Sequence, residues 1–104
     1  MLRIQQLQEF LKEDPNDIFS LYALALEHLK INQHHTAIQL LKKVITLNPD
    51  YVAAYYQLGQ ALEKTNTAEA AAAYKSGIET ATRIKNNHAK AELMSAYNML
   101  TNDY

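Results

Sequence analysis

Histidine is the residue type in this chain most suited to binding a metal ion or acting as a general base, and there are four of them. His34 and His35 are adjacent, so on a helix their side chains would point about 100° apart. A metal-binding pair on one helix instead uses a spacing of three or four residues. Glu27 likewise points away from His28 on a helix. We therefore expect no metal site, with His34 and His35 on the surface and His28 packed against a neighbouring helix.

The other residues that could carry catalysis are also poorly arranged for it. Gly59 and Gly77 are isolated within helical segments, so they form no phosphate-binding loop or dinucleotide motif, and we interpret them as sites of close helix contact. Cysteine is absent, and the eleven acidic residues are spread along the chain. No pair of carboxylates has the apolar surroundings that acid–base catalysis requires. The sequence therefore predicts a protein that is not an enzyme and needs no cofactor.

The charge balance argues against nucleic acids and membranes as partners. Ten basic and eleven acidic residues give a formal net charge of −1. Seven tyrosines could stack on bases, but single-strand binders generally add a positive groove to such stacking platforms. No segment approaches the roughly 20 apolar residues of a membrane span, and the N-terminus lacks the apolar core of a signal peptide. We expect a cytoplasmic protein that binds neither nucleic acid nor membrane.

Two proline-containing breaks divide the chain at a regular interval. The sequence reads Asp-Pro-Asn-Asp at 14–17 and Asn-Pro-Asp-Tyr at 48–51, which places the only two prolines 34 residues apart. A shift of the same length superimposes apolar positions on one another, including Ile4 on Ile38, Leu7 on Leu41, Leu21 on Tyr55 and Leu24 on Leu58. A period of this length with a helix on either side of each break predicts stacked helical hairpins, which form extended binding surfaces.

Helical periodicity and capping signals give the expected elements. Apolar residues at helical spacing predict an all-α chain of about six helices, at 2–13, 17–31, 37–47, 51–64, 67–85 and 88–101. Asp14 could cap the second helix, and Asn32 suits a left-handed turn after it. Asn66 with Glu69 has the spacing of a capping box.

These residues resemble the tetratricopeptide repeat (TPR) family, whose unit is a 34-residue pair of antiparallel helices. In residues 18–51 the family's signature positions hold Leu21, Leu24, Ala25, His28, Ala37, Leu41, Val44 and Pro49. In residues 52–85, where the turn near Thr67 is one residue shorter, they hold Tyr55, Leu58, Gly59, Leu62, Ala70, Tyr74 and Gly77. The resemblance implies a short right-handed α-solenoid of antiparallel helix hairpins in which 1–104 form a single domain. That domain would comprise a half-repeat at 2–15, repeats at 18–51 and 52–85, and a capping helix at 88–101.

The second helix carries an additional apolar arc beside its core-facing row. Such an arc would face water unless a partner covers it, and exposed apolar patches commonly mark interaction sites. In TPR proteins this arc faces a concave groove that holds extended peptides or partner helices. The resemblance thus implies a protein-interaction module or scaffold, with a binding surface formed by Phe19, Tyr22, Leu26 and Leu29 and, on the fourth helix, by Tyr56, Gln57, Gln60 and Glu63.

Three alternatives compete for that surface. Phe19, Tyr22 and Leu26 could fold against a terminal helix of the same chain. Two chains could bury the patch mutually, which would make the protein a homo-oligomeric building block. Some TPR proteins grip C-terminal carboxylates with Lys and Asn side chains, but here Tyr22, Leu26 and Gln57 stand where those residues would be needed. The sequence does not identify the protein or peptide partner.

Overall fold

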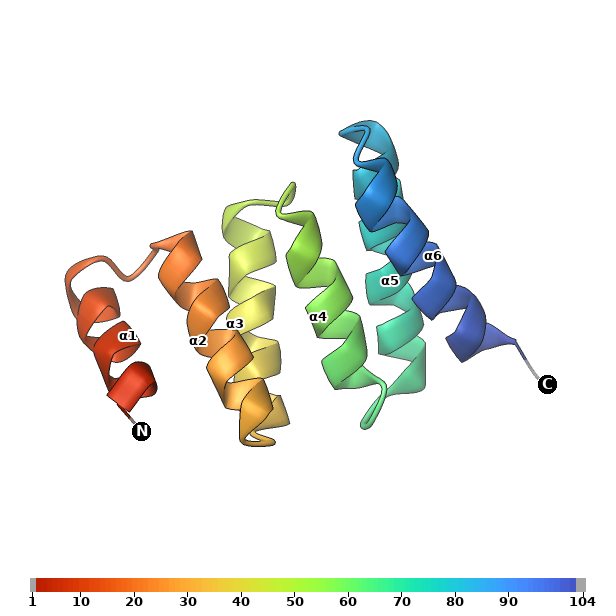
Figure 1. Ribbon diagram of the computed structural model, residues 1–104. Coiled ribbons are helices and arrows are strands. Elements are labelled where there is room, and N and C mark those ends of the chain that lie inside the picture. Colours follow the sequence, from red (N-terminus) through yellow and green to blue (C-terminus); the bar gives the residue numbers. More distant parts are fainter. Residues whose placement is uncertain (1, 103–104) are drawn as a thin grey trace.

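The computed structural model describes residues 2–102 and folds this range into six α-helices without any strand (Figure 1). This confirms the all-α fold predicted from the helical periodicity, and the helix ends lie within a few residues of the expected positions. The helices are α1 Leu2–Glu13, α2 Ile18–Lys30, α3 His34–Leu47, α4 Val52–Leu62, α5 Thr67–Arg83 and α6 Asn87–Thr101.

The helices stand in a row that follows their order in the chain. Each helix packs chiefly on the next one, and α4 also contacts α6. In Figure 1, α1 lies at one end and α6 at the other, with α2 overlapping α3 and α6 overlapping α5. The molecule is accordingly elongated, with principal dimensions of 44 × 28 × 18 Å. The arrangement is that of a short α-solenoid, in which stability comes from contacts between neighbouring helices.

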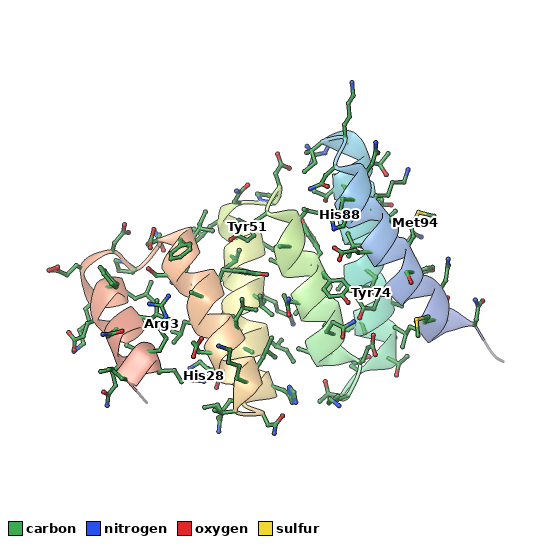
Figure 2. All side chains as sticks on the ribbon, viewed as in Figure 1. Arg3, His28, Tyr51, Tyr74, His88 and Met94 are labelled. Carbon is green, nitrogen blue, oxygen red and sulfur yellow. The ribbon has the colours of Figure 1, made fainter. Side chains whose placement is uncertain are left out.

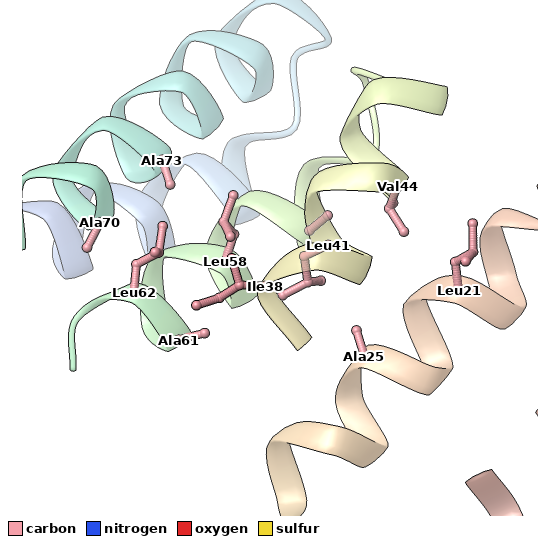
Figure 3. Close-up of a cluster of buried hydrophobic side chains, with 11 residues drawn as sticks. Leu21, Ala25, Ile38, Leu41, Val44, Leu58, Ala61, Leu62, Ala70 and Ala73 are labelled. Atoms are coloured by element: carbon pink, nitrogen blue, oxygen red, sulfur yellow. The ribbon is translucent and has the colours of Figure 1, made fainter. Parts of the chain in front are cut away.

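Two clusters of buried side chains run through the stack. One joins α2, α3, α4 and α5, and Figure 3 shows that its leucines and alanines point inward from all four helices. The other joins α4, α5 and α6 through Tyr55, Tyr74, Ala81 and Leu93. Burying one large apolar side chain contributes about 1.5–3 kcal/mol. Every successive pair of helices from α2 to α6 is therefore held by such contacts.

Both glycines lie at close helix contacts, as predicted. A Cβ atom added to Gly59 in α4 would overlap the ring of Tyr74. A Cβ added to Gly77 in α5 would lie 2.8 Å from Tyr55 Cβ and 3.0 Å from Leu93. Tyr74 is fully buried, so its ring has no free space into which it could move. The glycines thus allow α4, α5 and α6 to approach one another closely.

The turns confirm the left-handed conformation of Asn32, with a φ of 61°, and the cap at Asn66. The Asn66 side chain accepts a hydrogen bond from the Glu69 backbone N–H at 3.1 Å. The reciprocal bond of a capping box is not formed, because the Asn66 backbone N–H donates to Leu62 and the Glu69 carboxylate accepts from Asn66 Nδ2. The prediction for Asp14 was wrong. Asp17, three residues further on, caps α2 by accepting from the Ser20 N–H at 3.1 Å, because the turn around Pro15 delays the start of the helix.

Arg83 forms a contact that the local sequence does not reveal. The spacing of Glu79 and Arg83 is that of a stabilising pair on one helix surface. The structure instead pairs the Arg83 guanidinium with Asp50, which lies in the turn between α3 and α4. The hydrogen bond from Arg83 lowers the pKa of Asp50. Both side chains are exposed, so the pair joins the end of α5 to that turn while contributing little to stability.

Replacing Gly59 with alanine will destabilise the protein. Alanine gains about 1 kcal/mol in helix propensity, but its methyl group would overlap the buried Tyr74 ring, and overpacking of this kind costs about 1–3 kcal/mol. We expect a net loss, measured as a lower urea midpoint for unfolding followed by circular dichroism. The control Ala72→Gly, at an exposed position within α5, gives the propensity effect alone. A Gly59→Ala protein as stable as the original would contradict the close contact.

The correction to the α2 cap gives a second test. Asp17→Ala should lower the free energy of unfolding by about 0.5–2 kcal/mol, because the Ser20 N–H loses its acceptor. Asp14→Ala removes a carboxylate from the same turn and should change that free energy by less than about 0.5 kcal/mol. Thermal unfolding of the two variants side by side is the measurement. Equal losses would show that Asp17 is not the main cap.

Candidate functional site

A groove of about 770 Å³ lies between α4 and α6. It is lined by Tyr56, Gln60 and Glu63 from α4 and by Ala91, Glu92, Ser95, Ala96, Met99 and Leu100 from α6. We call this the α4–α6 groove. It combines apolar surface with an amide, two hydroxyls and two carboxylates, and apolar pockets with a few polar groups are the usual form of ligand sites.

Tyr74 lies beneath the α4 side of the groove and holds two of its lining residues in place. Although the tyrosine is fully buried, its hydroxyl donates a hydrogen bond to the Glu63 carboxylate and accepts one from Gln60 Nε2 at 2.8 Å. Its ring centroid is 6.2 Å from that of Tyr56. Burial, and then the hydrogen bond to Glu63, raise the pKa of Tyr74 well above the usual value. Figure 2 labels Tyr74 in the region where α4, α5 and α6 meet.

Tyr22 packs against the start of α4. Its ring lies 5.0 Å from that of Tyr51, the N-cap of α4, with the two planes tilted by 51°. Burial raises the pKa of Tyr22, the nearby Tyr51 raises it further, and the Gln57 side chain opposes both effects. Tyr22 and Gln57 do not line the α4–α6 groove.

The remaining predicted residues of α2 differ in exposure. Phe19, in the first turn, has 67% of its surface exposed. Leu26 and Leu29 are half-buried, and Leu29 packs against the core. Of the eight predicted residues, the structure thus gathers Tyr56, Gln60 and Glu63 in the groove. The other five, on α2 and α4, do not line it.

Sequence reasoning missed the α6 half of the groove. The sequence pattern predicts only a capping helix at 88–101 and places none of its residues in the binding surface. A usable signal existed, because Ala91, Ser95 and Met99 recur at helical spacing in the same way as Tyr56, Gln60 and Glu63 on α4. Extending the arc from α4 to the next equivalent helix would have found them.

The histidines and carboxylates do not gather into a metal-binding group within the described residues. Nowhere in residues 2–102 do three or more His, Asp or Glu side chains form a group that could hold a metal ion. His28 is half-buried, as expected, and His35 is exposed. His34 is half-buried rather than on the surface, with its Nδ1 atom buried.

Within residues 2–102 no helix is long and apolar enough to cross a membrane.

Comparison with known proteins identifies the fold and the family. Residues 26–66 match the family model described as TPR repeat. A tetratricopeptide repeat domain protein from Salinibacter ruber is 37% identical, with a TM-score of 0.78, and the alignment covers 85% of this chain and 90% of that one. No curated protein sequence matches the chain.

More distant structures share the fold. The TPR2B domain of yeast Sti1, solved in a complex with pHsp70, has a TM-score of 0.87 at 20% identity, covering 94% of this chain and 79% of that one. The TPR2AB domain of the same protein, solved with pHSP90, also has a TM-score of 0.87 at 20% identity, covering 95% of this chain and 39% of that one. The Salinibacter relative, together with the matching repeat model, establishes that the chain belongs to the tetratricopeptide repeat family.

Proposed function

We propose that the chain is a protein-interaction module that holds a peptide or a partner helix in the α4–α6 groove. The observation that carries this proposal is the groove itself, because it is large and leaves an apolar side chain accessible: Met99 is 78% exposed. The family is one of protein-interaction folds rather than enzymes. The two yeast Sti1 domains, which share the fold, were solved with pHsp70 and pHSP90.

The lining residues offer two kinds of contact to a ligand. Tyr56, Met99 and Leu100 offer apolar surface, and interface cores are enriched in such aromatic and methionine side chains. Gln60 and Ser95 offer hydrogen-bonding groups that could orient a peptide backbone. We extend the proposed surface from the groove to Phe19, Tyr22, Leu26, Leu29 and Gln57 on α2 and α4. The scaffold role and the cytoplasmic location stay predictions.

A homo-oligomeric building block is the second candidate. Phe19 is 67% exposed and Phe10, on α1, is 64% exposed. Two copies of the chain could cover these rings mutually, and burying large aromatic side chains is a strong driving force for association. In that case part of the proposed binding surface would be an interface between copies.

The first test uses a random peptide library displayed on phage and selected on the immobilised protein. Met99→Ser should weaken the selected peptides by about tenfold, since burying a side chain of this size contributes about 1.5–3 kcal/mol before the costs of association. Fluorescence anisotropy with labelled synthetic peptides measures the change. The matched control is Met94→Ser, which alters another methionine of α6 that is 42% exposed and does not line the groove. Peptides that lose affinity equally in both variants, or a selection that yields none, would overturn the proposal.

The second test separates the two candidates by molar mass. If the surface is a receptor for other proteins, analytical ultracentrifugation should show a monomer across the concentrations at which peptides bind. A dimer that dissociates in Phe19→Ser would favour the building block. The thermal midpoint of Phe19→Ser serves as the control for folding, because this exposed side chain can be changed with little effect on stability.

A further inference from the structure

We propose that the α4–α6 groove selects a cationic peptide segment, with a lysine or arginine side chain seated between Glu63 and Glu92. This inference rests on the proposed function and specifies the partner's chemistry. Glu63 and Glu92 are the charged residues among those that line the groove. A segment that carries positive charge would complement both, whereas a carboxylate or phosphate would be repelled.

The groove carboxylates are free of lysine and arginine partners, which sets them apart from several others in the stack. Glu9, Glu27 and Glu69 are each paired with a lysine, and Asp50 with Arg83. Over residues 2–102, no lysine or arginine forms an ion pair with either groove carboxylate. The nearest positive group to Glu92 is His88, whose Nε2 lies 3.8 Å away and is charged only when protonated. An incoming cation therefore displaces no strong ion pair.

The helix ends add to the same electrostatic preference. Glu63 is the C-cap of α4, and Met99 and Leu100 lie in the last turn of α6. The C-terminus of a helix carries a partial negative charge, which favours cations within about one turn. Neither α4 nor α6 has a basic residue in its last turn, in contrast to α1, α2 and α5. Lys64 follows Glu63 directly but does not line the groove. These two helix ends are therefore available to a positive ligand.

The Glu63 carboxylate is also held in position before any ligand binds. One oxygen accepts the hydrogen bond from Tyr74, and a carboxylate has further lone pairs that can accept from a cation at the same time. Because Tyr74 is fully buried, the carboxylate is anchored to the core, which reduces the conformational entropy lost on binding. The exposed Met99 and the Tyr56 ring offer apolar surface for the alkyl part of a lysine or arginine side chain.

The experiment compares two short peptides, acetylated and amidated so that neither has charged ends, that repeat Ala-Leu-Lys or Ala-Leu-Glu. Their dissociation constants are measured by fluorescence anisotropy. We expect the lysine peptide to bind at least about fivefold more tightly, and Glu63→Gln and Glu92→Gln each to weaken it by roughly two- to fivefold, the range for partly exposed charge pairs. Added salt should reduce the preference. The amide oxygen introduced by Glu63→Gln can still accept from the Tyr74 hydroxyl, so the fold should persist.

The matched control is Glu79→Gln, which makes the same change in net charge at an exposed carboxylate of α5 away from the groove. It should leave the affinity for the lysine peptide unchanged. The proposed preference for a cationic partner would be overturned by any of three results. These are equal affinity for the two peptides, an equal loss of affinity in all three variants, and no binding of the lysine peptide. The same measurements test the groove separately. Peptides that lose affinity for Met99→Ser but not for Glu63→Gln or Glu92→Gln would support the proposed interaction module and refute only the charge selectivity.

Discussion

The packing of Tyr74 against Gly59 connects the core of this solenoid to its candidate binding surface. The tyrosine ring fits against α4 only because position 59 has no Cβ atom, which would otherwise overlap the ring. From that position the hydroxyl reaches Gln60 and also Glu63, which lies one turn beyond Gly59 on the same face of α4. One close contact between helices therefore fixes both the approach of α5 to α4 and the orientation of two groove side chains. A substitution at Gly59 would therefore change both the stability of the stack and the geometry of the groove.

Much of the fold could be predicted because its determinants are local or periodic. Apolar spacing places each helix, Asn66 and Asn32 mark their turns by backbone chemistry that neighbouring residues determine, and the repeated proline breaks give the order of the stack. Gly59 and Gly77 could be assigned to helix contacts for the same reason, since isolated glycines within helices otherwise only lower stability. Each of these signals lies within a few residues of the feature that it specifies.

The features that escaped prediction depend on contacts between distant segments or on competition between similar residues. Asp14 and Asp17 are both good caps, and the path of the turn around Pro15 decides between them. Arg83 has a carboxylate one turn away on its own helix, yet the packing of α5 beside the α3–α4 turn brings Asp50 to it instead. The α6 half of the groove was missed because the amphipathicity of that helix alone fits a solvated outer face, and its role becomes apparent only when α6 is compared with α4.

The sizes of the side chains help to explain the hollow between α4 and α6. On the α2 side of α4, the large Tyr22 ring packs against the ring of Tyr51, the N-cap of α4. On the α6 side, the groove is lined in part by Ala91, Ser95 and Ala96, which extend little toward α4. Small residues on the facing side of α6 thus leave room for the groove of about 770 Å³. In such a short stack the position of a binding site is set by the residues on the facing sides of alternate helices, while the core positions maintain the spacing between those helices.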